Sequence, residues 1–378
     1  MIINNVRLVL EDEVIDGSIE IRDGAIRAYA ETRSHLPEAM DGEGGWLLPG
    51  LIELHTDNLD KFFTPRPKVD WPAHSAMSSH DALMVASGIT TVLDAVAIGD
   101  VRDGGDRLEN LEKMINAVEE TQKRGLNRAE HRLHLRCELP HHTTLPLFEK
   151  LVDREPVSLV SLMDHSPGQR QFASLEKYRE YYQGKYSLND VEMARYEEEQ
   201  LALAAQWSQP NRVSIAAMCR DRNIALASHD DATHDHVRES HQLGSVIAEF
   251  PTTFEAAEAS RAHGMNVLMG APNIVRGGSH SGNVAASKLA SLGLLDILSS
   301  DYYPASLLDA AFRVADDDSN RFTLPQAIRL VTKNPASALN LHDRGEIAEG
   351  KRADLVLAHR KGEHIHIDHV WRQGKRVF

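Results

Sequence analysis

The chain has 378 residues, of which 42% are hydrophobic, and this content excludes a wholly disordered protein. Its net charge of −15 disfavours a nucleic-acid-binding protein, which needs basic surface to replace phosphate counterions. Its two cysteines are too few for a disulfide framework, and no apolar run is long enough to span a membrane. The opening MIINNVRLVLEDE has acids where a signal peptide would be apolar. We therefore expect a soluble cytoplasmic protein with neither nucleic-acid nor membrane partners.

Short strands are predicted at both ends of the chain, separated by Asp-Gly and Gln-Gly turns. We expect the two sets to pair with each other in one small β domain, and two unrelated sets of edge strands are the alternative. The expected strands are residues 2–3, 6–10, 18–21 and 25–30 at one end and 355–358, 364–367, 370–372 and 375–378 at the other.

Eight apolar runs, separated by helical segments, occupy the middle of the chain. Runs without clean alternation are typical of strands that are buried on both faces. Eight of them predict an α/β fold, a (β/α)8 barrel. A doubly wound open sheet is the competitor, but the glycine-rich turn expected after its first strand is missing. The eight runs are 46–55, 90–97, 133–139, 157–164, 224–228, 246–250, 266–270 and 297–300.

A long polar insertion, residues 171–210, follows the fourth run and has a helical pattern. In a barrel this connection lies on the C-terminal face, where loops carry function. The insertion is expected either to cap the site or to form a subunit contact, and the sequence favours neither.

The first barrel strand ends in ELHTDNLDK, which places Glu53, His55 and Asp57 on one side of the strand. An imidazole beside a carboxylate is a suitable half-site for a divalent metal. A single His-x-Asp pair often arises by chance, so the other strand ends decide whether it is significant.

Five further runs also end in histidine or an acid, and active sites of such barrels gather at these carboxyl ends. A solvated strand end would explain any one of them, but six together predict a metal centre. The five ends are Cys137-Glu138, Asp164-His165, Ser228-His229-Asp230-Asp231, Glu249-Phe250 and Ser300-Asp301.

The remaining histidines are less specific signals. The third strand is bracketed by His131, His134, His141 and His142, of which only inward-facing side chains are relevant. The predicted helix after the fifth strand carries His234, His236 and His241, which are expected to be solvated or to support the site. The terminal β domain carries His364 and His366, which are expected at its surface.

Two basic segments could bind an anionic ligand. Residues 270–283, GAPNIVRGGSHSGN, combine glycines, which let backbone N–H groups approach an oxyanion, with Arg276 and His280. This segment predicts a phosphate or pyrophosphate cradle, and an ordinary glycine-rich loop is the alternative. Lys61, Arg66 and Lys68 form a second basic cluster, which should lie above the barrel mouth.

Long stretches of the chain resemble the amidohydrolase superfamily. The resemblance covers the whole chain and is carried by INNVRLVLEDEVIDGSIEIRDGAI, LLPGLIELHTD and RGEIAEGKRADLVLA. It implies a (β/α)8 barrel inserted between the halves of a small β-sandwich. The barrel would occupy residues 49–344, and the sandwich halves residues 1–48 and 345–378.

Within that superfamily the chain resembles the diphosphatases of phosphonate degradation. The motifs are HTDNLDKFFTPRPKVDWP, SLMDHSPGQ, EFPTTFEAAEASR, GAPNIVRGGSHSGN and LSSDYYP. The implied reaction is hydrolysis of α-D-ribose 1-methylphosphonate 5-triphosphate, a small-molecule partner, to the 5-phosphate and diphosphate. This step belongs to phosphonate catabolism by the C–P lyase pathway.

The resemblance also implies one or two divalent ions, Zn²⁺ or Mn²⁺ by ligand type, with Glu138 as the bridging ligand. Two departures are visible: His55 and Asp57 stand where relatives usually have His-x-His, and Glu249 stands where many have histidine. The implied metal ligands are His55, Asp57, Glu138, His165, His229, Glu249 and Asp301.

The mechanism expected from these residues is metal-assisted hydrolysis of a phosphoanhydride, with Asp301 orienting the water and accepting its proton. Arg276, His280 and Lys61 would neutralise the triphosphate. Two alternatives are a deaminase or cyclic-amide hydrolase, the commoner chemistry of the superfamily, and a non-enzymatic scaffold. A homo-oligomer is expected.

Overall fold

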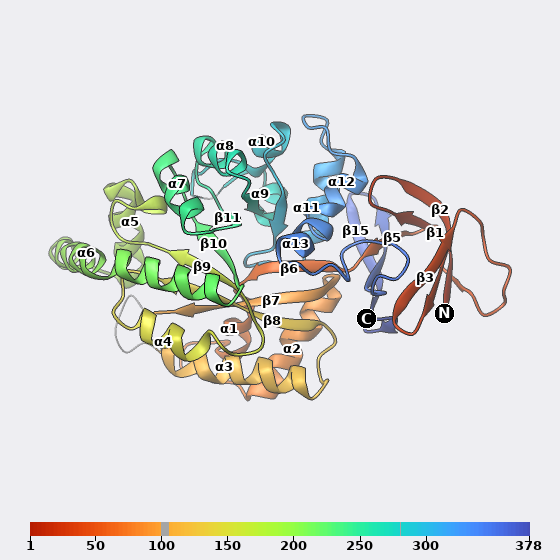
Figure 1. Cartoon of the computed structure of the whole chain (residues 1–378), viewed down its shortest axis with the longest axis horizontal. Helices are drawn as coiled ribbons and strands as arrows, with labels where there is room; N and C mark the ends of the chain where they lie inside the picture. Colours follow the sequence, from red (N-terminus) through yellow and green to blue (C-terminus); the bar gives the residue numbers. More distant parts are fainter. Residues whose placement is uncertain (100–105, 280) are drawn as a thin grey trace. The chain divides into compact units, whose positions relative to one another are not determined.

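The computed structural model describes residues 1–99, 106–279 and 281–378, and these form two eight-stranded sheets with helices between the strands (Figure 1). The first sheet has the order β16-β15-β14-β5-β1-β2-β3, with β4 paired to β1. The second has the order β13-β12-β11-β10-β9-β8-β7-β6.

Both ends of the chain contribute to the first sheet, as the terminal strand patterns predict. Strand β5 joins the two halves, because Leu47 aligns with Leu8 on β1 and with Leu357 on β14. These three leucines belong to one buried core, together with Ile19 and Trp371. The strands are β1 (Ile2–Val9), β2 (Val14–Arg22), β3 (Ala25–Ala30), β4 (Met40–Asp41), β5 (Trp46–Pro49), β14 (Leu355–Lys361), β15 (His364–Arg372) and β16 (Lys375–Arg376).

The second sheet is a nearly closed parallel barrel, which confirms the predicted fold class. A parallel bridge between Thr56 and Asp301 joins its first and last strands. Each of the eight predicted runs overlaps one barrel strand. The strands are β6 (Leu51–Thr56), β7 (Ile89–Ile98), β8 (Glu130–Glu138), β9 (Val157–Met163), β10 (Ala225–His229), β11 (Ile247–Glu249), β12 (Asn266–Gly270) and β13 (Ile297–Ser299).

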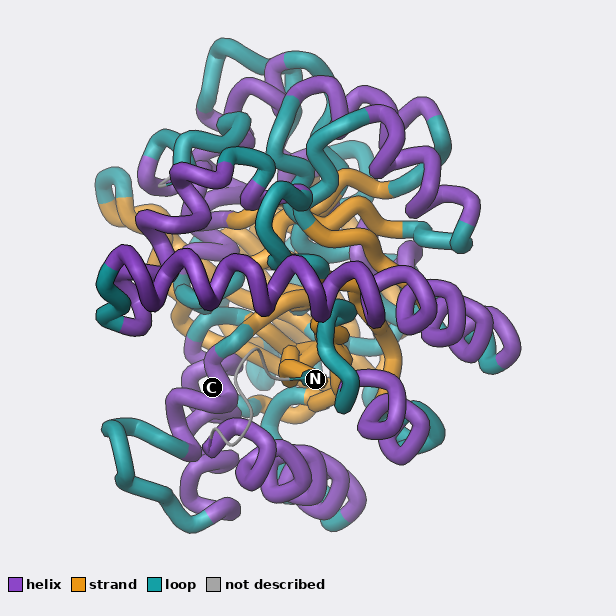
Figure 2. The backbone as a smooth tube through the Cα atoms, turned by 90° about the vertical axis from the view of Figure 1, so that its left-hand side faces the viewer, coloured by secondary structure: helices purple, strands orange, loops and turns teal. Residues whose placement is uncertain are grey.

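Helices separate the barrel strands along the chain, and Figure 2 draws the helices in purple and the strands in orange. Among the described residues, none of the helices is both long and apolar enough to cross a membrane. Before the insertion they are α1 (Asn58–Phe63), α2 (Ala73–Ala86), α3 (Asp106–Lys123) and α4 (Thr144–Leu151); after it they are α7 (His234–Gln242), α8 (Phe254–Ala262), α9 (Ala271–Arg276), α10 (Ala286–Ser291), α11 (Ser306–Asp316), α12 (Leu324–Arg329) and α13 (Lys333–Ala338).

The predicted run 46–55 is wrong as a single strand, because it is divided between the two sheets. Strand β5 ends at Pro49 and β6 begins at Leu51. The residue between them is Gly50, where a Cβ would come within 2.2 Å of the Thr90 hydroxyl. Only glycine fits this close approach, which lets the chain pass from one sheet to the other.

The insertion is helical, as its pattern predicts, and has a core of its own. It comprises a short 3-10 turn η1 (Arg170–Phe172), α5 (Leu175–Tyr186) and α6 (Asp190–Asp221). Two hydrogen bonds from the Arg179 guanidinium to Glu197 join α5 to α6. Their buried aromatic core consists of Phe172, Tyr178, Tyr182 and Tyr196 with Met193.

The chain divides into two compact units. The first contains residues 1–94, 116–132 and 269–378, and the second contains residues 95–115 and 133–268. The candidate functional residues fall into both.

Candidate metal centre

In the first unit, the bridge between β6 and β13 brings His55, Asp57 and Asp301 together. The Asp57 N–H donates to the Asp301 carbonyl, and the Asp301 N–H donates to the His55 carbonyl, both at 3.1 Å. The Nε2 atom of His55 lies 3.7 Å from Asp57 Oδ2 and 3.9 Å from Asp301 Oδ1. The imidazole is buried, whereas about a third of each aspartate side chain is exposed (33% and 32%). A cation held here would therefore remain accessible from solvent.

Glu53 lies beneath this group and holds both strand ends. It is fully buried, and its two oxygens accept the N–H groups of His55 and Ser300, each at 2.7 Å. Burial raises the pKa of Glu53 to about 7, although these hydrogen bonds act to lower it. The carboxylate thus fixes the backbone on both sides of the barrel seam. It shares the strand face of His55, as the alternation predicts.

In the second unit, His165, His229 and Asp230 form another group at the ends of β9 and β10. The Asp230 Oδ2 atom lies 3.6 Å from His165 Nε2 and 3.4 Å from His229 Nε2. The two imidazole rings are nearly perpendicular, with centroids 5.6 Å apart. Asp230 is in the strand-end run Ser228-His229-Asp230-Asp231, but it is missing from the predicted ligands.

Glu138 and Glu249 orient the two imidazoles of this group. The Nδ1 atom of His165 donates to Glu138 at 2.7 Å, and that of His229 donates to Glu249 at 2.9 Å. In metal sites, a carboxylate on one ring nitrogen fixes the tautomer and leaves the other nitrogen for the ion. Their assignment as direct metal ligands stays a prediction.

The electrostatics of the second group favour a bound positive charge. Burial acts to lower the pKa of His165, but the charge of Glu138 and the hydrogen bond to Asp230 raise it to about 10. Burial acts to raise the pKa of Glu138, but the charge of His165 together with the hydrogen bonds from His165 lowers it. The carboxylates therefore stabilise a positive charge at the imidazole position.

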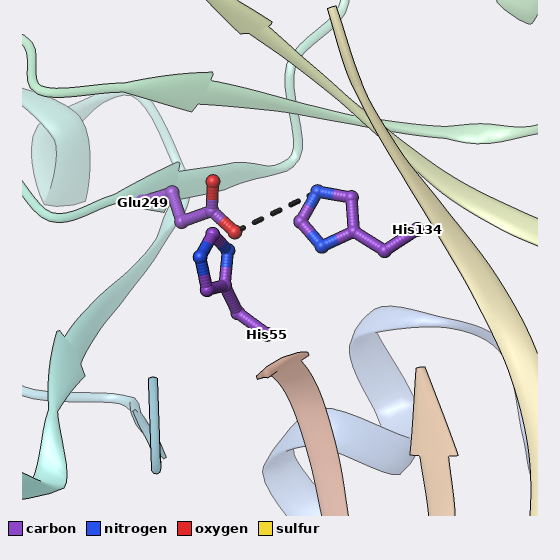
Figure 3. A group of neighbouring side chains, drawn as sticks. All are labelled: His55, His134 and Glu249. Carbon is purple, nitrogen blue, oxygen red and sulfur yellow. Dashed lines mark ion pairs between the residues drawn. The ribbon is translucent and has the colours of Figure 1, made fainter. Parts of the chain in front are cut away.

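His134, on β8, is the inward-facing histidine among those that bracket the third strand. Its Nε2 atom forms a 2.9 Å hydrogen bond with the Ser161 hydroxyl and lies 3.8 Å from Glu249 Oε1 (Figure 3). Figure 3 draws this ion pair together with His55. His134 is missing from the predicted ligands because the sequence alone does not show which side chains of β8 point inward.

The spacing within both groups fits a divalent metal. Two ligand atoms about 2.1 Å from a tetrahedral ion are separated by about 3.4 Å. The separations of 3.4–3.9 Å around His55 and Asp230 are close to this value. Imidazole and carboxylate together suit Zn²⁺ and Mn²⁺. The residues present therefore fit the implied ion.

Buried ion pairs hold the loops that carry the second group. Arg170 donates to Asp231 at 3.0 Å, and Arg212 of α6 donates to Asp164 at 3.4 Å. Asp231 and Asp164 are chain neighbours of Asp230 and His165. The insertion reaches this group too, because the Phe172 ring lies against the His165 ring with centroids 6.2 Å apart. This contact supports the cap interpretation of the insertion.

In the predicted basic cluster, Lys61 lies on a helix and Arg66 and Lys68 lie in the turn that follows it. Lys61, on α1, donates to the carbonyl of Tyr302 at 3.2 Å, directly after Asp301, and therefore lies beside the first group. Arg66 and Lys68 are exposed in the following turn. Their assignment to substrate binding stays a prediction.

The predicted glycine-rich cradle is only partly a loop. Residues 271–276 form helix α9, so Arg276 is in a last helical turn, and Gly277 ends the helix in a left-handed conformation. Pro272 near the helix start favours this, because its missing N–H would have no partner there. His280 lies outside the described residues. The roles of Arg276 and His280 stay predictions.

The remaining histidines behave largely as expected. His364 and His366 are exposed on β15. His236 has a supporting role, because its Nδ1 accepts the Ala232 N–H at 3.1 Å in the loop after Asp230 and Asp231.

A nearly closed parallel barrel whose strands end in histidines and carboxylates is the arrangement of a metal-dependent barrel hydrolase. A protein-family model described as the amidohydrolase family matches residues 84–378. The chain belongs to the amidohydrolase family.

A curated relative from Escherichia coli (strain K12) is α-D-ribose 1-methylphosphonate 5-triphosphate diphosphatase. It is 89% identical over 378 residues, 100% of both chains. Solved structures are far less similar in sequence and support the fold alone. N-acetylglucosamine-6-phosphate deacetylase from Thermotoga maritima has a TM-score of 0.60 at 16% identity, covering 100% of this chain and 99% of that one. 5-Methylcytosine deaminase from Klebsiella pneumoniae has a TM-score of 0.64 at 16% identity, covering 100% and 98%.

Proposed function

We propose that this protein hydrolyses α-D-ribose 1-methylphosphonate 5-triphosphate to the 5-phosphate and diphosphate. The observation that carries the proposal is the 89% identity, over the whole of both chains, to the diphosphatase. Strand-end groups with metal-ligand chemistry support it. The reaction is a step of phosphonate catabolism, in the cytoplasm, by a homo-oligomer.

The candidate ligands of both units lie at the carboxyl ends of strands in one barrel sheet, and we assign them to one or two Zn²⁺ or Mn²⁺ ions. When bound, a divalent cation supplies Lewis-acid charge, which polarises a phosphoryl oxygen and makes water more acidic. The ligands are His55, Asp57, Glu138, His165, His229, Glu249 and Asp301, to which the geometry adds Asp230.

Side chains of the protein orient the water, accept its proton and neutralise the phosphates. Asp301 orients the attacking water and accepts its proton. Glu53 keeps Asp301 and His55 in position through the backbone of both strand ends. Lys61, Arg276 and His280 place positive charge near the phosphates, where negative charge spreads over the oxygens as the anhydride bond breaks.

Phosphorus NMR of metal-loaded protein with the triphosphate substrate tests the reaction. We expect diphosphate and the 5-monophosphate to appear together, and activity to be lost on chelation and regained when metal is returned. Orthophosphate with the 5-diphosphate would show that a different anhydride bond is cleaved. An unchanged spectrum with metal bound would contradict the proposal, and amide substrates would then be tested for deaminase or cyclic-amide hydrolase activity.

A further inference from the structure

Helix α1 directly follows the strand end that carries His55 and Asp57. Leu59 and Phe63 on this helix are fully buried and anchor it, whereas Lys61 lies between them in sequence and is exposed. Residues four apart share one face of a helix, so Leu59 and Phe63 point to the core and Lys61 points away from it. The helix therefore presents the Lys61 side chain on its solvent side.

Two neutral oxygen atoms hold the Lys61 ammonium. Its Nζ atom donates to Asn58 Oδ1 at 3.3 Å and to the Tyr302 carbonyl at 3.2 Å. Tyr302 directly follows Asp301, so these contacts keep the ammonium at the seam between the first and last barrel strands. Among the side chains that the structure describes, no carboxylate forms an ion pair with Lys61. The ammonium, which has three N–H donors, thus keeps one donor and its full charge for a ligand.

Asn58 connects this ammonium to the strand seam. It is buried, and its Nδ2 atom donates to the Thr56 hydroxyl at 2.7 Å and to the Asp301 carbonyl at 3.4 Å. An amide donates through its nitrogen and accepts through its oxygen, so Asn58 bridges the seam and the ammonium without adding charge. An aspartate at this position would also accept from Lys61, but it would neutralise the ammonium.

A fixed ammonium beside a candidate cation site is suited to an anion that contacts both. Two positive charges repel, and a shared anion between them removes that repulsion. A phosphate carries its negative charge on several oxygens, and a lysine ammonium is a common donor to them. We infer that Asn58 is a positioning residue, which holds the Lys61 ammonium in place to donate to a phosphate oxygen of the substrate. This inference deepens the proposed function and rests on it.

Diphosphate binding to the full-length, zinc-loaded protein tests the inference by calorimetry, with the zinc content measured before and after each titration. We expect Lys61→Met to weaken diphosphate binding about tenfold or more, because a hydrogen bond between charged groups is lost. Asn58→Ala should weaken it about three- to tenfold, because Lys61 is still present but is no longer held.

The matched control is Asn127→Ala. Asn127 is also a buried asparagine that donates to a threonine hydroxyl, that of Thr121, at 3.1 Å. It precedes strand β8, whereas Asn58 follows the end of β6, so the two lie at opposite ends of a parallel barrel. Asn127→Ala should bind diphosphate as the parent does.

A double-variant cycle separates a positioning role from a structural one. If Asn58 acts through Lys61, Asn58→Ala should cause no further loss of diphosphate binding in the Lys61→Met background. The same pair should be non-additive in kcat/KM for the triphosphate substrate. Asn58→Asp should also weaken diphosphate binding, although it keeps an acceptor oxygen, because its carboxylate compensates the ammonium charge.

Parental diphosphate binding in Lys61→Met, or absence of binding by the parent, would overturn the inference. Additive effects of the two substitutions, or loss of zinc from Asn58→Ala, would also overturn it, since Asn58 would then act through the strand seam. If Asn58→Ala does not fold, Asn58→Asp decides: weaker binding supports the assignment and parental binding overturns it. Diphosphate binding that depends on Lys61 and Asn58, by a parent that leaves the triphosphate intact, would contradict the proposed function and leave this phosphate contact standing.

Discussion

Asp230 and Asp301 owe their positions to a local feature of the backbone. Asp230 directly follows β10, Asp301 lies two residues after β13, and both have a positive φ, 57° and 55°. A left-handed conformation costs a non-glycine residue roughly 1–2 kcal/mol, and aspartate is among the residues that adopt it most readily. The turn directs each carboxylate to within 4 Å of an imidazole, at 3.4 Å and 3.9 Å respectively. Backbone strain of this kind is typical of functional sites.

Replacement of Asp301 by asparagine should abolish the base and keep the fold, because the side chains have the same size. We expect kcat to fall by about 10²–10⁴-fold. Steady-state kinetics together with the melting temperature check this. A nearly normal kcat would remove Asp301 from the role of base.

Replacement of Asp230 by asparagine should weaken metal binding, because the carboxylate charge between His165 and His229 is lost. A supporting residue of a metal site typically contributes 10–100-fold to affinity, and a direct ligand should contribute at least as much. Metal titration of the apoprotein measures the change. The matched control is Asp235→Asn, on the exposed start of α7, where the side chain is 83% exposed. Equal affinities in both variants would exclude Asp230 from the centre.

The α5–α6 hairpin is the element in which the sequence left two roles open. Its aromatic core explains why a polar segment folds: Phe172, Tyr178, Tyr182 and Tyr196 bury their rings against one another. Because Phe172 also contacts His165, the order of the hairpin and of the second candidate group should be linked. A subunit contact by the outer face of the hairpin stays a prediction.

Tyr178→Ala should therefore destabilise the hairpin selectively. Tyr178 is 1% exposed, and deletion of a buried aromatic side chain costs about 3–5 kcal/mol. We expect faster amide hydrogen exchange in α5 and the start of α6. Tyr181→Ala, in the same helix but 51% exposed, should cost less than about 1 kcal/mol. Equal exchange in the two variants would argue against a tyrosine core.

At the scale of the molecule, a buried ionic network ties distant segments of the first unit together. His80 on α2 pairs with Asp94 on β7 at 2.6 Å, and His131 on β8 bridges Asp94 and Asp81 at 2.7 and 2.9 Å. All four side chains are fully buried or nearly so. Burial acts to lower the pKa of His131, but the charge of Asp94 and the hydrogen bonds to Asp81 and Asp94 raise it to about 9.

This network should make the protein less stable in mild alkali. The unfolded chain has a histidine pKa of about 6.5, so the contribution of His131 is complete below that pH. It is lost as the pH rises to about 9, where the folded state releases the proton. Urea unfolding at pH 6 and pH 9 measures the loss. His131→Asn should show a smaller difference between the two pH values, and an unchanged difference would contradict the prediction.

Much of the architecture could be predicted because it rests on local patterns. The apolar runs identify all eight barrel strands, and histidines or acids at their ends indicate where metal chemistry is concentrated. Residues 271–276 form a helix where a glycine-rich loop was predicted. The sequence does not separate the two, because a short helix that begins with proline and a glycine-rich loop have similar compositions.

The sequence by itself determined the order of strands and helices, the pairing partners of the termini and the residue types that could bind a metal. These follow from periodicity and side-chain chemistry, which act over a few residues. Only the tertiary structure decided which of those residues meet. It placed Thr56 beside Asp301, and it brought His134 within 3.8 Å of Glu249. Such contacts depend on barrel closure and strand register, which join residues far apart in the chain and leave no local signal.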